Sequence, residues 1–242
     1  MAVAPDGATL GISLGGPLAI NTLLFSKLPY DPAQDIAPIT LLTSLPSVLV
    51  VPSNLGINTV AEFVAALKRD GTKFAFGSIG GTAHYLAYQL EKVTGARFRI
   101  VSMKGAQAVL SVLGGHVQMA FDAITTMAEN VKAGQVRALG TSASKRSKVL
   151  PDIPTIAEAG VPGYESTIWL GIMAPKGTPQ AIVDKLNAEI NKVINKPEVL
   201  AAWEKQGAVP LVMTPTEFEA YLRKDIEKWA NVVNAAGLAP KN

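Results

Sequence analysis

Strand-like and helix-like segments alternate through the middle of this 242-residue chain, and no other feature constrains its fold as strongly. The first such strand, Ser47–Pro52, is apolar on both faces, which is typical of a buried parallel strand. Thr59 and Glu62 then have the spacing of a capping box at the start of a helix. Because the turns are short, the alternation predicts an α/β fold: a parallel sheet with helices on both faces. The other expected strands are 73–77, 98–101, 117–121 and 136–141, and the other expected helices are 82–94, 106–113 and 125–133.

The two ends of the chain are less regular, and proline and glycine interrupt them more often. A turn at Pro5–Gly7 opens directly into the first expected strand, and this abrupt start indicates that earlier βα units are absent. Thr178 is expected to cap a helix that has Pro179 at its first position. The remaining expected strands are 8–13, 36–43, 166–174 and 209–212, and the remaining expected helices end near 25 or span 156–159, 179–195, 198–206 and 215 onward.

The composition excludes several classes of protein. Hydrophobic residues make up 48% of the chain and charged residues 17%, which is not the composition of a disordered chain. The 22 basic and 19 acidic residues are scattered, so we expect no nucleic-acid groove. Without cysteine there can be no disulfide or thiolate zinc site, and His84 and His116 alone do not suggest a metal centre. No apolar run is long enough to span a membrane, and we expect no signal peptide in this chain.

The most informative local feature is a glycine-rich turn, residues 76–84, which follows one expected strand and opens the next helix. Free backbone N–H groups at a helix N-terminus favour an anion, and the Ser78 and Thr82 hydroxyls could add donors. The turn matches neither the dinucleotide-binding motif nor the P-loop motif. An ordinary turn capped by Thr82 remains the alternative.

Two further strand-to-helix turns carry polar residues. Ser13 and Gly15 stand in a turn of the same physical character as the glycine-rich one. Asp122 ends an apolar strand, where its carboxylate could cap the next helix or face a ligand.

Catalytic candidates are few. Gly11–Gly15 fits the Gly-x-Ser-x-Gly pattern of a nucleophile elbow centred on Ser13, but neither histidine is a convincing base for it. A serine hydrolase using Ser13 therefore stays only an alternative, and we expect the protein not to be an enzyme.

A series of short motifs stands in order along nearly the whole chain: Pro5–Gly7, Leu28–Pro32, Lys104–Gly105, Leu113–Val117, Phe121–Asp122, Arg137–Leu139, Ser144–Ser147, Leu150–Thr155, Glu158–Gly160, Pro162–Glu165, Trp169 and Ala174–Pro179. Together they resemble the Bug family, the TctC-like extracytoplasmic solute-binding proteins of tripartite tricarboxylate transporters.

The resemblance implies a two-lobed fold like that of type II periplasmic binding proteins, which closes on a small ligand. Lobe one would comprise 1–52 and 173–242, and lobe two 53–172, with crossovers near 47–52 and 166–174. The family's leading segment, which includes its signal peptide and first βα units, has no counterpart here. Lobe one is therefore expected to be incomplete at its N-terminus, whether the chain is a fragment or a shortened member.

The resemblance also implies a carboxylate-bearing metabolite as ligand, held by backbone N–H groups and hydroxyls, without a metal or cofactor. The implied partners are the membrane components of a tripartite tricarboxylate transporter, and the implied location is the periplasm. A truncated remnant with impaired binding is a further alternative. The matching ligand-binding positions are Ser13, Gly15, Ser78, Gly80, Gly81, Thr82 and Asp122, and the one candidate cation near them is Lys104.

Overall fold

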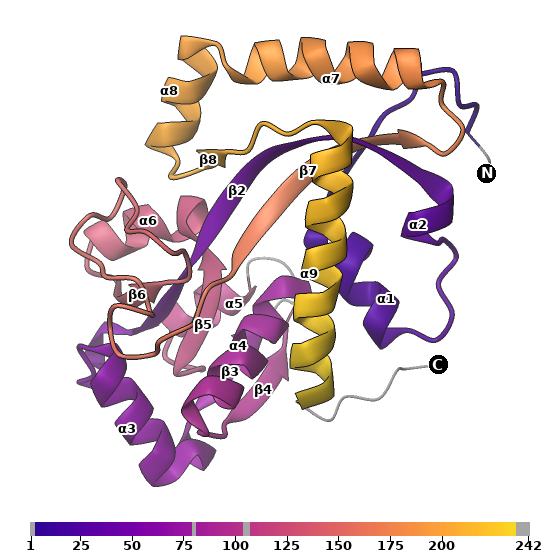
Figure 1. The fold of residues 1–242 in the computed structure, drawn as a ribbon. Coiled ribbons are helices and arrows are strands. Elements are labelled where there is room, and N and C mark those ends of the chain that lie inside the picture. Colours follow the sequence, from indigo (N-terminus) through magenta and orange to yellow (C-terminus); the bar gives the residue numbers. More distant parts are fainter. Residues whose placement is uncertain (1–2, 79–80, 104–106, 236–242) are drawn as a thin grey trace. The chain divides into compact units, whose positions relative to one another are not determined.

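The computed structural model describes residues 3–78, 81–103 and 107–235, with the backbone alone at 78, 81–85, 102 and 235 (Figure 1). The chain divides into two compact units. Unit 1 is Met1–Ser44 with Trp169–Asn242, and unit 2 is Leu45–Ile168. The strands β2 (Ile36–Pro52) and β7 (Thr167–Pro175) each continue from one unit into the other. The lobe limits expected from sequence, after 52 and after 172, lie further along these two strands.

The sheet of unit 2 has the strand order β4–β3–β5–β2–β6. Strand β3 runs parallel to β4 and to β5, whereas β2 runs antiparallel to β5 and to β6. The prediction that Ser47–Pro52 is a parallel strand was therefore wrong. Its apolar faces reflect burial, and helices on both faces bury a strand whatever its direction. The bounds are β3 Ala75–Ser78, β4 Arg99–Ser102, β5 Met119–Ala123 and β6 Val136–Thr141.

Helices cover both faces of this sheet, as the alternating pattern predicts. Successive residues of β2 point to opposite faces. Leu49 and Val51 pack with Phe63 of α3, while Val48 and Val50 pack with Met127 of α6. The helices of unit 2 are α3 Val60–Asp70, α4 Gly81–Thr94, α5 Gln107–Leu113 and α6 Ile124–Lys132, with 3₁₀ turns at Ser53–Leu55 and Gly71–Lys73.

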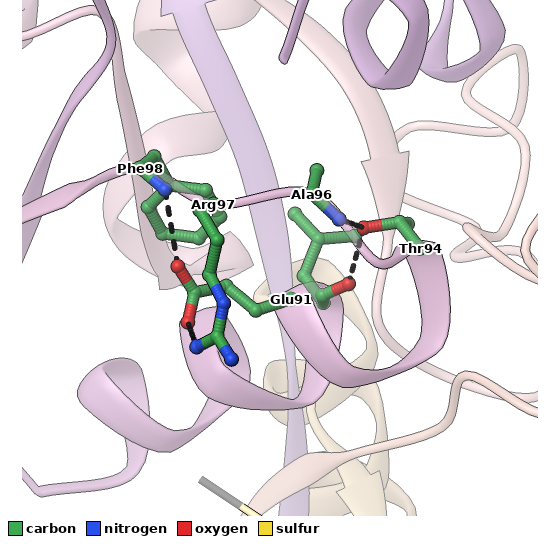
Figure 2. A network of polar contacts seen from close by, with 6 residues as sticks. Glu91, Thr94, Ala96, Arg97 and Phe98 are labelled. Atoms are coloured by element: carbon green, nitrogen blue, oxygen red, sulfur yellow. Dashed lines mark hydrogen bonds and ion pairs between the residues drawn. The ribbon is translucent and has the colours of Figure 1, made fainter. Parts of the chain in front are cut away.

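The C-terminal turn of α4 is joined to β4 by a polar network (Figure 2). The buried Glu91 carboxylate accepts hydrogen bonds from Phe98 N (3.0 Å) and Arg97 Nη1 (3.2 Å). The Thr94 hydroxyl donates to Leu90 O (2.6 Å) and accepts from Ala96 N (3.2 Å). These bonds hold the connection that leads the chain into the sheet.

The sheet of unit 1 contains β1 (Gly11–Leu14), β7 and the first part of β2, with β8 (Val209–Pro210) also paired to β2. Trp169 packs edge-on against Phe218 and Tyr221 of α9, each with ring centroids 5.8 Å apart. The helical segments are a π-helix at Gly16–Ile20, α1 Asn21–Leu24, α2 Pro32–Asp35, α7 Gln180–Ile194, α8 Pro197–Lys205 and α9 Pro215–Ala235 (Figure 1).

Several local predictions need correction. The expected runs 36–43 and 47–52 form one continuous strand, β2. Pro179, not Thr178, holds the N-cap position of α7, because the Thr178 hydroxyl turns back to Pro175 O (2.8 Å). The expected helix at 156–159 is a series of turns that ends at Gly160, whose φ is +108°. The last strand is only Val209–Pro210, shorter than the expected 209–212, although Leu211 N still donates to Leu42 O (3.0 Å).

Candidate functional site

Polar residues gather along one edge of the unit 2 sheet. Strands β3, β5 and β6 all run in the same direction, and their carboxyl ends carry Ser78, Asp122 and Thr141. Because β2 runs the opposite way, its Ser47 pairs with Ala123 at this same edge. Ligands of open α/β sheets bind at the carboxyl ends of the strands, so this edge is the candidate binding edge of unit 2.

Among the residues named at this edge, Asp122 is the charged one. Burial raises the pKa of its carboxyl group, and a hydrogen bond from Ala123 N (2.7 Å) opposes that rise. Ala123 holds the N-cap position of α6, and no side chain caps that helix. The alternative in which Asp122 caps α6 is therefore wrong. Its carboxylate accepts one hydrogen bond from the described residues, and ligand binding by Asp122 stays a prediction.

The glycine-rich turn can be followed only in part. Gly77 packs closely in the sheet, since a Cβ there would lie 3.1 Å from Val117 Cγ2. Ser78 ends β3, and Gly81 and Thr82 begin α4, a 14-residue helix. The side chains of Ser78 and Thr82 lie outside the described part of the chain, as do Gly80 and Lys104 entirely. Ligand binding at these positions stays a prediction. The structure confirms only that a strand ends before this turn and that a helix begins after it.

In unit 1, Gly15 has a packing role. It is buried, and a Cβ there would lie 2.7 Å from Trp169 Nε1. The indole N–H donates to Asp225 Oδ2 (2.8 Å), and burial raises the pKa of that aspartate. The close approach of Trp169 therefore accounts for glycine at position 15, whether or not a ligand also contacts it.

Ser13 does not stand on a nucleophile elbow. That motif places serine on a strained turn between strand and helix. Here Ser13 lies inside β1, in register with Gly171, and no described non-glycine residue has a positive φ. Its hydroxyl makes a long hydrogen bond to the neighbouring Leu14 O (3.4 Å). The geometry gives the hydrolase alternative no support, and ligand binding by Ser13 stays a prediction.

Sequence reasoning missed a buried polar group close to the binding edge. The side-chain oxygens of Ser47, Thr141 and Ser166 there are buried without a hydrogen-bond partner among the described residues, while the nearby Ser142 is fully bonded. A fourth such atom, Gln89 Oε1, lies on α4. The sequence did offer a signal, which is a hydroxyl residue where an apolar run begins or ends. Thr141 and Ser142 end the run 136–141, and Ser47 and Ser166 begin the runs 47–52 and 166–174.

Two surface cavities lie elsewhere. The one in unit 2 has a volume of about 810 Å³ and is lined in part by Val60, Arg137 and Asp152, at the starting end of β6. The one in unit 1 has a volume of about 610 Å³ and is lined in part by Lys176 and Arg223. Of the predicted site residues whose side chains the structure describes, Ser13, Gly15 and Asp122, none lines either cavity. In the described parts of the chain, no group of histidine and acidic side chains could hold a metal ion. Nor is any described helix both long and apolar enough to cross a membrane.

Comparison with solved structures shows close similarity over nearly the whole chain. R. palustris Rpa4515 with adipate matches with a TM-score of 0.91 and 30% identity, over 99% of this chain and 81% of that one. The periplasmic binding protein BugD matches with a TM-score of 0.87 and 27% identity, over 99% and 81%. MatC from Rhodopseudomonas palustris, with bound malate, matches with a TM-score of 0.83 and 29% identity, over 96% and 80%.

These neighbours confirm the expected α/β fold of the type II periplasmic binding protein kind. They are binding proteins, and the family model that matches residues 1–238 describes the receptors of one transporter class. The chain belongs to the TctC family, the tripartite tricarboxylate transporter family receptors.

Proposed function

We propose that this protein is an extracytoplasmic receptor that captures a small carboxylate-bearing metabolite for a tripartite tricarboxylate-type transporter. The observation that carries the proposal is the match to Rpa4515 with adipate, which extends over 99% of the chain. MatC, the neighbour with bound malate, also holds a dicarboxylate. The implied partners are the membrane components of the transporter, and the implied location is the periplasm.

Neutral donors would hold the ligand's carboxylate. Backbone N–H groups at the start of α4 are unsatisfied by the helix itself and attract an anion, and Ser78 and Thr82 supply hydroxyls close to them in sequence. Ser13 and Gly15 would contribute from unit 1. This arrangement would bind and orient a ligand.

Asp122 would select among carboxylates. A carboxylate on the binding edge repels a second anion but accepts a hydrogen bond from a hydroxyl, an amine or a protonated acid. We therefore propose that the preferred ligand carries such a donor in addition to its carboxylate, as malate does with its hydroxyl group.

Isothermal titration calorimetry against a panel of carboxylates tests the proposal. The panel contains adipate, malate and succinate, with the corresponding diamides as uncharged controls. We expect at least one acid to bind with a one-to-one stoichiometry, malate to bind more tightly than succinate, and the diamides not to bind. Failure of every acid to bind or to raise the melting temperature would favour the remnant alternative.

Turnover must be excluded in the same samples. An ester or amide substrate panel should show no hydrolysis above background. Hydrolysis that disappears in Ser13→Ala would contradict the assignment as a receptor.

A further inference from the structure

Ser142 connects the two chain segments through which unit 2 continues into unit 1. The chain enters unit 2 between Ser44 and Leu45 and leaves it between Ile168 and Trp169. Ser47 is the third residue after the first boundary, and Ser166 is the third residue before the second. Ser142, directly after β6, is hydrogen-bonded to both of them.

Four hydrogen bonds join these three serines, and all three are at most 1% exposed. Ser142 N donates to Ser47 O (2.8 Å), and Ser47 N donates to Ser142 Oγ (2.9 Å). On the other side, Ser166 N donates to Ser142 O (2.7 Å), and Ser142 Oγ donates to Ser166 O. We call the chain around Ser47 and the chain around Ser166 the crossing segments. Ser142 both donates a hydrogen bond to the backbone of each crossing segment and accepts one from it.

The hydroxyl of Ser142 has two tasks that require a group able to donate and accept at once. It accepts from the N–H of one crossing segment while it donates to the carbonyl of the other. Alanine would leave a buried N–H and a buried carbonyl without partners, and solvent has no access to replace the lost bonds.

We propose that Ser142 is a positioning residue that makes the two crossing segments move as one hinge. The chain passes between the units only at these two places, so backbone rotation there must absorb any rotation of one unit against the other. If Ser142 ties the segments together, it restricts the unliganded receptor to arrangements that can bind. The effect on affinity rests on the proposed function, whereas the coupling of the segments does not.

Distances between spin labels, measured by double electron–electron resonance without ligand, test the coupling. The chain has no cysteine, so Lys68→Cys on α3 and Lys192→Cys on α7, both exposed, carry the only labels. We expect Ser142→Ala to broaden the distance distribution. The same variant without labels should bind the acids of the panel, adipate and malate among them, about tenfold more weakly, because a smaller fraction is competent to bind.

Thr94→Ala is the matched control, because the Thr94 hydroxyl also accepts from a backbone N–H and donates to a backbone carbonyl (Figure 2). Both of its bonds stay between Leu90 and Ala96, at and just after the end of α4, and contact neither crossing segment. At a similar loss of stability, Thr94→Ala should leave the distance distribution and the affinity unchanged. A Ser142→Ala distribution identical to that of Thr94→Ala would overturn the proposal.

Amide hydrogen exchange of the unaltered chain gives a test that needs no variant. If the segments open as one hinge, the amides of Ser47 and Ser166 should exchange with the same free energy of opening and respond equally to denaturant. Clearly different values would refute the coupling even if Ser142→Ala does not fold. Conversely, a panel in which no carboxylate binds would overturn the proposed function and leave these ligand-free results standing.

Discussion

Strands β1 and β2 are both apolar in sequence, yet they occupy opposite environments. From Ile39 onward β2 is almost entirely buried, with Val48–Val51 at 0% exposure between helices on both faces. Strand β1 pairs within the described sheet only with β7, and its Ile12 is 66% exposed. Apolar composition alone therefore predicts a strand but not its burial, because burial depends on what packs against each face.

The largest expected difference between the two strands is in stability. We expect Leu49→Ala to lower the free energy of unfolding by about 2–5 kcal/mol, since it leaves a cavity in a closed core. Ile12→Ala should change it by no more than about 0.5 kcal/mol, as is usual for exposed sites. Equilibrium denaturation of both variants makes the measurement. Equal losses would contradict the contrast between a buried and an edge strand.

The two units can also be compared as contributors to ligand binding. We expect Thr82→Val to weaken carboxylate binding by about 1.5–3 kcal/mol, the range for a hydrogen bond to a charged group. Ser13→Ala should have a smaller effect, because the Ser13 hydroxyl bonds weakly within its own strand and is only partly buried. Calorimetric titration with adipate and malate gives both values. Unchanged affinity of Thr82→Val for all ligands would remove the start of α4 from the site.

The exposed edge of β1 should promote weak self-association. Strands at a sheet edge present unpaired backbone groups, and Leu10, Ile12 and Leu14 add exposed apolar surface. We expect Ile12→Lys to shift the chain toward monomer in sedimentation velocity at high concentration. Leu110→Lys is the control, because Leu110 is 64% exposed on a helix and not on a strand edge. Equal effects of the two variants would mean that exposure alone, and not the strand edge, drives association.

The smallest expected effect is a pH dependence that distinguishes two carboxylates of unit 2. Burial raises the pKa of Asp122, so its neutral form stabilises the folded state at low pH, and this contribution is lost as the pH rises through the raised pKa. The N–H of Thr155 and the Arg146 side chain lower the pKa of Glu158, so its contribution is present near neutral pH and is lost on acidification.

Melting temperatures between pH 3 and pH 7 check both signs. Asp122→Asn should melt at a higher temperature than the unaltered chain, and this difference in melting temperature should be larger at neutral pH than at acidic pH. Glu158→Gln should show the opposite trend, with its loss confined to the neutral range. A parallel response of the two variants would show that one of these environments is wrongly described.

Much of the fold could be predicted because local patterns report local structure. The capping residue Thr59 accepts the expected bond from Glu62 N (3.1 Å), and α3 begins at the next residue. The final helix, α9, begins at Pro215, where the sequence predicts it. The alternation of strands and helices in unit 2 was confirmed for the same reason. The exact start of a helix and the exact end of a strand were predicted less reliably, as Thr178 and the strand ending at Pro210 show.

The sequence by itself determined most of the elements, the α/β class and, through a series of ordered motifs, the family. Strand direction, the exposure of β1, the packing of Gly15 on Trp169 and the joining of Ser47, Ser142 and Ser166 were decided only by the tertiary structure. Periodicity and capping involve residues only a few positions apart, so both can be recognised in a short stretch of sequence. The Ser142 contacts bring together residues 95 positions apart on one side and 24 on the other, and no local pattern records such a meeting.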